Sequence, residues 1–278
     1  MSIFQLTILL FLNTIIEFLP ISSTAHGLII YKILNINIDI NLILAVAQIG
    51  IIIGICNYFK NNIIDIIKNL IKFDKKYILF CLKVLLTMLP TIFIGTCFYS
   101  FIKNYCQNNL SISICLIIGS GIMFLAEKHY KNNKINNTIN SINNLYDIDF
   151  KSAIKIGLFQ CLSLIPGVSR SASTVSGAMF SNLSRNIAIE LSFFISIPIS
   201  LSASFYDIYK YFTISNNDFN NNYTIIIYCF IISLCFSLFF CKKIINFLKN
   251  NNLYIFIYYR VVLGLLILIG KIWHLLKI

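Results

Sequence analysis

The chain has 278 residues, of which 58% are hydrophobic and only 12% charged, whereas soluble domains carry about 25% charged residues. This balance excludes an ordinary soluble protein and predicts an all-α integral membrane protein, a single polytopic domain over residues 1–278. The net charge of +12 comes largely from lysines between apolar segments, where they set topology and contact anionic headgroups. Membrane lipids are therefore expected partners, and nucleic acid is not.

The first segment carries a polar motif inside apolar sequence, Glu17-Phe-Leu-Pro-Ile-Ser-Ser-Thr-Ala-His26. Hydrocarbon penalises a carboxylate, an imidazole and hydroxyls unless they face a partner or a water-filled cavity. Pro20 can end one helix, and Ser22 or Ser23 can cap the next one. We therefore expect a broken helix with a functional turn.

Six strongly apolar segments predict about six membrane-spanning helices. The connections between them alternate in charge, and by the positive-inside rule the lysine-rich ones lie in the cytoplasm. The lysine-poor connections hold only Lys103 and Lys210. The apolar segments are approximately 41–57, 78–101, 110–126, 187–208, 223–241 and 253–276. The lysine-rich connections contain Lys60, Lys68, Lys72, Lys75, Lys76 and Lys83, then Lys128, Lys131, Lys134, Lys151 and Lys155, then Lys242, Lys243 and Lys249.

This orientation constrains the two segments that carry polar motifs. The segment before the first span must deliver the chain to the outer face, and the segment before the fourth span must begin and end on the cytoplasmic side. We therefore predict two re-entrant helical hairpins, 1–36 and 152–184. They would belong to an inverted-topology repeat of approximately 1–126 and 152–278, joined by a cytoplasmic linker at 127–151. The alternative is a pair of unrelated proline-broken helices.

The second motif is Leu164-Ile-Pro-Gly-Val-Ser-Arg-Ser-Ala-Ser-Thr174. Pro166 can end a helix, and the helix start that follows offers unpaired N–H groups and a positive dipole end to an anion. Arg170 adds a planar fork that matches phosphate oxygens. Its alternative roles are snorkelling or an ion pair with Glu190. The residues predicted to bind phosphate are Ser22, Ser169, Arg170, Ser171 and Thr174.

The first motif supplies the candidates for chemistry. Beside a bound diphosphate, Glu17 can act as a general base or hold a divalent cation, Mg²⁺ or Ca²⁺; the alternative is a counter-ion to Arg170. Ser23 and His26 would share a helix face, which suits a nucleophile and a base or acid, although serines in membrane helices also bond backbone carbonyls. The expected supporting or packing residues are Gln48, Gln160 and Glu190.

Both motifs resemble the signature motifs of the bacterial undecaprenyl-diphosphatase family, also called the bacitracin resistance proteins. The resemblance covers nearly the whole chain and includes Gln48-Ile-Gly, Leu89-Pro90, Ile156-Gly-Leu-Phe-Gln160, Glu190-Leu-Ser-Phe and Tyr259-Arg260. It implies a multi-pass inner-membrane hydrolase that removes the terminal phosphate of the C55 isoprenoid diphosphate. The monophosphate carrier would be recycled for peptidoglycan synthesis, with bacitracin resistance as a result. The resemblance also implies an inverted-repeat fold and a site that faces the periplasm.

Position by position, the family's catalytic glutamate, serine and histidine fall on Glu17, Ser23 and His26, and its phosphate-binding arginine falls on Arg170. The family usually has a second glutamate one helical turn before the first, and here that position is Asn13. An asparagine can ligate a cation through its carbonyl oxygen but brings no charge and cannot act as a base. A metal site at Glu17 and Asn13 is therefore in doubt. The nucleophile (Ser23, His26 or water) and a homodimer stay open.

Two other functions compete with this interpretation. A transporter or flippase of a phosphorylated lipid would also use inverted repeats, but it would release no phosphate. A lipid phosphatase of the PAP2 type would need a Pro-Ser-Gly-His stretch, and the sequence has none. We therefore expect hydrolysis by an electrostatic clamp on the diphosphate.

Overall fold

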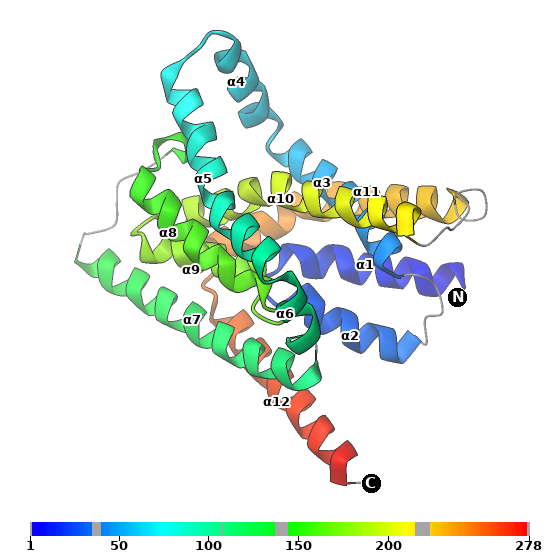
Figure 1. Cartoon of the computed structure of the whole chain (residues 1–278). Coiled ribbons are helices and arrows are strands. Elements are labelled where there is room, and N and C mark those ends of the chain that lie inside the picture. The colour runs from blue at the N-terminus through cyan, green and yellow to red at the C-terminus, as the bar shows by residue number, and fades with distance from the viewer. Residues whose placement is uncertain (1, 35–39, 107, 137–143, 215–222, 277–278) are drawn as a thin grey trace.

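The computed structural model describes residues 2–34, 40–106, 108–136, 144–214 and 223–276, and all regular structure in them is helical (Figure 1). Two short 3₁₀ turns, η1 (Leu145–Asp147) and η2 (Leu162–Leu164), lie beside twelve α-helices. The helices are α1 (Ile3–Phe18), α2 (Ser23–Leu34), α3 (Ile40–Tyr58), α4 (Lys60–Ile71), α5 (Lys75–Cys97), α6 (Tyr99–Tyr105), α7 (Asn109–Ile135), α8 (Phe150–Cys161), α9 (Arg170–Phe180), α10 (Arg185–Ile214), α11 (Tyr223–Asn250) and α12 (Tyr254–Leu276).

The all-α membrane class is confirmed. Within the described residues, α5, α7, α10 and α11 are long and apolar enough to cross a membrane. A fifth crossing is counted if α3 and α4, bent by 76° at their junction, form one span, while the described apolar parts of α1 and α12 are shorter. Each of the six predicted apolar segments lies largely within a helix, but their number as crossings stays a prediction.

The outer surface carries many large apolar side chains. Large hydrophobic side chains such as Leu89, Phe93, Ile118 and Leu266 are more than half exposed. A water-soluble monomer rarely shows contiguous apolar surface on this scale, so lipid tails must cover it. The buried core runs through the middle of the bundle and contains Phe18, Ile51, Ile55, Met179 and Ile195.

Both polar motifs lie at breaks between paired helices. α1 ends at Phe18 and the chain turns through Pro20 before α2 returns along α1, so that the two helices form a hairpin (Figure 1). α8 passes into η2, and the segment around Pro166 leads to α9, which packs against α8. The predicted broken helices are therefore present, while their entry from opposite leaflets stays a prediction.

Several helix contacts are repeated between the two halves of the chain. α11 packs on α1 as α5 packs on α8, so exchange of the two halves turns one contact into the other. α3 also contacts α10, and α7 contacts α12, which are contacts between helices at corresponding places in the two halves. The pattern is incomplete, because α3 packs extensively on α11 whereas α10 touches α5 only lightly. The proposed repeat boundaries stay a prediction, and the one at residue 126 lies inside α7.

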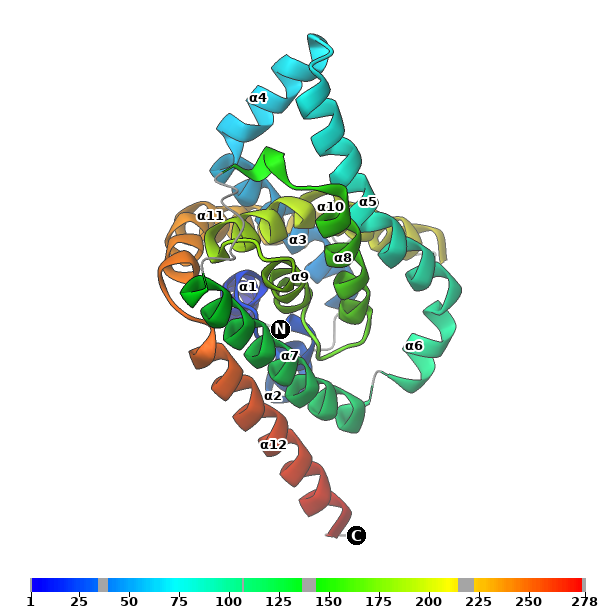
Figure 2. The same ribbon diagram turned by 90° about the vertical axis from the view of Figure 1, so that its left-hand side faces the viewer.

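The second hairpin lies at the centre of the molecule. Figure 2 shows α9 surrounded by α8, α10 and α7, with α4 and α5 projecting on one side and α12 on the other. α9 is short and rich in small residues, and eight of its eleven residues are buried. This packing carries the start of α9, at Arg170, to the turn between α1 and α2.

Candidate active site

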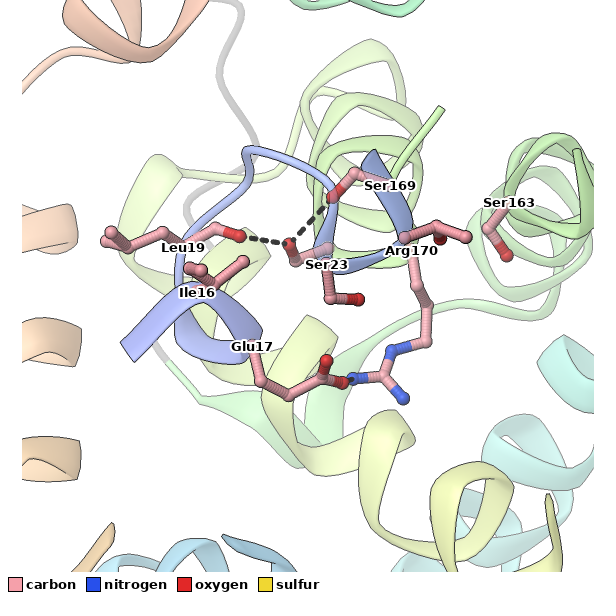
Figure 3. Close-up of a pocket in the computed structure, with 9 residues that line it drawn as sticks. Ile16, Glu17, Leu19, Ser23, Ser163, Ser169 and Arg170 are labelled. Atoms are coloured by element: carbon pink, nitrogen blue, oxygen red, sulfur yellow. Dashed lines mark hydrogen bonds and ion pairs between the residues drawn. The ribbon is translucent and has the colours of Figure 1, made fainter. Parts of the chain in front are cut away.

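A polar cavity of about 200 Å³ opens where the two motif breaks meet (Figure 3). Both motifs contribute to its wall, although they are separated by more than 130 residues in the sequence. The wall combines one carboxylate, one guanidinium and several hydroxyls, which is an unusual set inside an apolar bundle. The lining residues are Ile16, Glu17, Leu19, Ser23, Thr24, Ser163, Ser169, Arg170 and Ser171.

The same backbone device begins both helices at the cavity. Ser22 and Ser169 precede the first residues of α2 and α9, with φ of 73° and 75°. Each serine Oγ accepts from the backbone N–H three residues later, Ala25 or Ala172, at 3.5 Å. A left-handed conformation costs a residue other than glycine about 1–3 kcal/mol and persists only where its surroundings impose it.

These two turns direct two helix N-termini at one cavity. The first-turn residues Ser23 and Thr24 of α2, and Arg170 and Ser171 of α9, all line it. The N–H groups of a first helical turn have no partner inside the helix and carry the positive end of its dipole. Two such ends beside a guanidinium make a site for a highly charged anion such as a diphosphate.

An ion pair joins the two motifs inside the cavity. Arg170 Nη2 lies 2.9 Å from Glu17 Oε1, and the two side chains face each other in Figure 3. Their side chains are 23% and 15% exposed, so a ligand in the cavity can reach both. Arg170 Nη1 donates to Ser200 Oγ on α10, and Gln48 Nε2 on α3 donates to Glu17 Oε1 at 3.3 Å. Each charged group is therefore held by a neutral partner on a long helix.

Hydroxyl groups connect the loops at a second point. Ser171 Oγ donates to the carbonyl oxygen of Leu19 at 3.4 Å and lies 3.3 Å from Ser169 Oγ. Thr24 and Ser163 also line the cavity, and the sequence did not single them out as binding residues. The signal for Thr24 was its place in the hydroxyl run, and the signal for Ser163 was its position just before the second break.

His26 lies outside the cavity lining, on the far side of the first turn of α2. Its Nδ1 is 2.8 Å from the carbonyl oxygen of Ser22, and its Nε2 is 2.6 Å from the hydroxyl of Tyr259, whose ring stacks on the imidazole. Because a carbonyl only accepts, Nδ1 carries a proton, and Nε2 of the neutral ring accepts from Tyr259. The proposed part of His26 in proton transfer stays a prediction.

Ser22 and Thr174 are also buried behind the lining. Ser22 is 2% exposed and caps α2. Thr174 donates to the carbonyl oxygen of Arg170 at 2.9 Å and shares a hydrogen bond with Ser192. In this structure both residues support a helix start that faces the anion cavity, and neither contacts the cavity itself.

The remaining predicted residues lie at different places. Gln160 donates to Thr91 Oγ1 at 3.0 Å and joins α8 to α5. Glu190 pairs with Lys249, so it is not the partner of Arg170. Asn13 lies on α1 one turn before Glu17 and is absent from the cavity lining.

The donor set does not fit a resident metal ion. Glu17 is the single carboxylate of the lining, and the guanidinium of Arg170 already neutralises it. The described residues contain no group of three or more His, Cys, Asp or Glu side chains placed to hold a metal. Mg²⁺ and Ca²⁺ favour several oxygen ligands, of which carboxylates are the strongest. We therefore derive no step through a protein-bound ion.

Arg260 is a buried residue that the sequence indicated only through the Tyr259-Arg260 pair. Its side chain has no exposed surface and donates to backbone carbonyls of both motif loops, Pro20 at 3.2 Å and Val168 at 2.9 Å. An arginine inside an otherwise apolar final segment is the one signal that could have marked it.

Comparison with known protein families identifies nearly the whole chain. Residues 6–266 match the family model of the bacitracin resistance protein BacA. The chain belongs to the BacA family. The match spans both motif loops and Arg260, so the entire cavity lies within the family's domain.

Curated relatives in the BacA family are similar over most of their length. Undecaprenyl-diphosphatase 3 of Acinetobacter baylyi is 34% identical over 95% of this chain and 96% of its own. Undecaprenyl-diphosphatase 2 of Shewanella oneidensis is 35% identical over 91% and 92%. The undecaprenyl-diphosphatase of Clostridium tetani is 30% identical over 99% of both chains.

Proposed function

We propose that this BacA-family protein is a phosphatase that removes the terminal phosphate of undecaprenyl diphosphate. The products are undecaprenyl phosphate and inorganic phosphate, so the lipid carrier is recycled for peptidoglycan synthesis and bacitracin loses its target. The observation that carries the proposal is the Glu17–Arg170 pair, held between two helix N-termini in one cavity. The names of the relatives agree with it.

Before substrate binds, Arg170 is already paired with Glu17. A diphosphate that enters the cavity competes with Glu17 for the fork of Arg170 and accepts from the first-turn N–H groups of α2 and α9. Once phosphate holds the guanidinium, the Glu17 carboxylate is released from its counter-ion and stays bonded to Gln48. The same change binds the anion and frees a base.

Phosphoryl transfer then needs positioning and charge stabilisation more than covalent chemistry. Arg170 and the two helix starts stabilise the negative charge on the terminal phosphoryl oxygens as the bond to the bridging oxygen breaks. Either a water or the Ser23 hydroxyl attacks the phosphorus, and in each case its proton passes to Glu17. Attack by Ser23 gives a phosphoserine that water must then hydrolyse. Ser23 and Glu17 both line the cavity, and the leaving monophosphate keeps the lipid.

The part of His26 is the least direct. To take or give a proton, its ring must give up the bond to Ser22 or to Tyr259. Movement of the α2 start on substrate binding would allow this exchange, because Ser22 is the cap of that helix. We therefore assign His26 to proton transfer in the substrate complex, with Tyr259 as its hydrogen-bond partner when no substrate is bound.

A divalent cation, Mg²⁺ or Ca²⁺, would come with the diphosphate and not reside in the protein. Phosphate oxygens would then complete the ligand set that one carboxylate and neutral hydroxyls leave short. Glu17 would be its protein ligand, and Asn13 one turn earlier would supply a neutral oxygen at most. EDTA should therefore lower turnover by lowering the concentration of cation-bound substrate.

The proposed setting is the bacterial inner membrane, with the cavity open to the periplasm. The lysine distribution supports the cytoplasmic side of three connections, and the resemblance to the family supports the periplasmic opening. Two connections assigned to the cytoplasm also contact each other, since Lys76 Nζ lies 2.7 Å from Asp147. The proposal leaves a homodimer open, and light scattering in detergent would test for one.

The decisive assay is phosphate release from C55 isoprenoid diphosphate by purified protein in detergent. Arg170→Ala should lower kcat/KM by about 10²- to 10³-fold, as expected when a group that stabilises transition-state charge is removed. Near-normal release by that variant would remove the core of the proposal. Background release by the native chain, together with lipid movement across vesicles, would instead favour a transporter.

A further inference from the structure

Arg260 has an unusual position for an arginine. It lies in the apolar helix α12, its side chain has no exposed surface, and no ion pair of it is found among the described residues. A buried cation without a carboxylate is costly unless its donors are all well used. Its terminal nitrogens donate mainly to backbone carbonyls of the two motif loops, with weaker contacts to the Met123 sulfur and to Leu116, while Nε has no partner among the described residues.

The two terminal nitrogens divide between the loops. Nη1 donates to the carbonyl oxygen of Pro20 in the first loop at 3.2 Å. Nη2 donates to Gly167 and Val168 in the second loop at 3.1 and 2.9 Å, and weakly to Leu116 of α7 at 3.4 Å. One rigid guanidinium therefore bridges segments that are more than 140 residues apart in the sequence.

We propose that Arg260 is a positioning residue that latches the two motif loops together and so sets the distance between the two helix starts that bind the diphosphate. This inference rests on the proposed function. Arg260 is absent from the cavity lining, so it acts through the backbone of the loops and does not touch the substrate.

The position of the bonded carbonyls supports a latch. Val168 comes directly before Ser169, and Pro20 comes two residues before Ser22, so Arg260 holds the peptide group that precedes the left-handed Ser169 and the one that precedes Ile21, just before the left-handed Ser22. Such strained residues keep their conformation only where surrounding bonds fix it. Without the bonds to Arg260, both serines should relax, and the two helix N-termini would no longer point into the same cavity.

A glycine on the neighbouring helix gives an independent way to disturb the latch. A Cβ at Gly119 of α7 would lie 2.3 Å from Arg260 Nη2 and 3.2 Å from the carbonyl oxygen of Val168. The guanidinium therefore lies directly against the backbone of α7 at Gly119, where a side chain would collide with it. Gly121 lies two residues later on the same helix, and a Cβ there would have nothing within 4 Å, so it is a matched control.

The experiment compares Gly119→Ala, Gly121→Ala, Arg260→Lys and Arg260→Gln in the full-length protein in detergent. Three quantities are measured: phosphate release from C55 diphosphate, binding of inorganic pyrophosphate by calorimetry, and the apparent Tm. We expect Gly121→Ala to match the native protein. Gly119→Ala should weaken pyrophosphate binding and lower kcat/KM by up to about 100-fold, which is the loss that a misplacement of about 1 Å produces.

The Arg260 variants separate the latch from the charge. Lysine keeps the positive charge but carries its three donors on one nitrogen, so it lacks the planar fork whose two ends reach different loops. The latch therefore predicts that Arg260→Lys loses nearly as much pyrophosphate affinity as Arg260→Gln. Native affinity in Arg260→Lys, or equal affinities in the two glycine variants, would overturn it.

The readouts also keep the two proposals apart. If the Arg260 variants do not fold, the two glycine variants still decide the question. Their apparent Tm values show whether both are folded, and their pyrophosphate affinities are then compared. Pyrophosphate binding without turnover in the native protein would contradict the phosphatase proposal, while weaker binding in Gly119→Ala would still support the latch.

Discussion

The two motif loops use one backbone design for opposite charges. Each breaks a helix, places a left-handed serine at the cap and starts a new helix at the cavity. The first loop contributes the carboxylate of Glu17 before its break, whereas the second contributes the guanidinium of Arg170 after its break. The repeated backbone therefore builds the anion site, and the differing side chains make its two walls chemically distinct.

The loops also differ in what supports them from behind. The first is tied to α12 through the His26–Tyr259 bond, whereas the second is tied to α10 through Thr174 and Ser192. Apart from Arg260 of α12, which bonds both loops, the first loop thus rests on an ionisable side chain and the second on a pair of hydroxyls. We infer that proton movement belongs to the first loop, whereas the guanidinium of the second loop contributes most of the anion binding that the two helix starts share.

The largest expected effect comes from removing the charge of the first loop. Glu17→Gln should lower kcat by about 10²- to 10⁴-fold, the usual contribution of a general base. Pyrophosphate binding should hold or improve, because Arg170 loses its internal competitor. Steady-state kinetics and calorimetry on the same preparation check this split.

Arg170→Ala is the counterpart and should lose binding as well as turnover. If Glu17→Gln weakened pyrophosphate binding as much as Arg170→Ala does, the two loops would not divide base and anion functions. Gln48→Leu offers a milder comparison, since it removes the neutral donor to Glu17 and keeps both charges.

The balance of one carboxylate to one guanidinium can be broken deliberately. Asn13→Glu adds a carboxylate one helical turn before Glu17. The extra negative charge should raise the affinity for Mg²⁺, so that the Mg²⁺ concentration for half-maximal phosphate release falls severalfold. An unchanged Mg²⁺ titration would show that position 13 does not reach the cation.

Part of this site was predictable from local sequence. The prolines and hydroxyl runs indicated two helix breaks with anion-binding helix starts, and the isolated Glu17 and Arg170 marked themselves as expensive polar groups in lipid. The bonds that fix them were not predictable, because Arg260 reaches Pro20 across 240 residues and His26 reaches Tyr259 across 233. In sequence, Arg260 is only an arginine in an apolar helix, and snorkelling would explain it equally well.

Stability measurements test whether the two breaks are equivalent. Ser22→Ala and Ser169→Ala should each destabilise the protein by about 1 kcal/mol, because the cap is lost while the left-handed strain remains. Ser22→Gly and Ser169→Gly should stay near the native stability, since glycine adopts a positive φ freely and recovers about 1 kcal/mol of strain.

Thermal unfolding in one detergent compares all four variants. The same order at both positions is expected if the breaks share one design. A glycine variant less stable than its alanine counterpart at either position would show that the cap dominates there and the strain does not.

The smallest expected effect concerns the support behind the first loop. Tyr259→Phe removes the hydroxyl that donates to His26 but keeps the stacked ring, so stability should fall by only about 1 kcal/mol, the typical contribution of one hydrogen bond. Thr174→Val is the matched change behind the second loop. If His26 transfers protons, Tyr259→Phe should alter the pH profile of kcat, whereas Thr174→Val should leave that profile unchanged and raise KM. Identical pH profiles for Tyr259→Phe and the native protein would assign the His26–Tyr259 bond to packing alone.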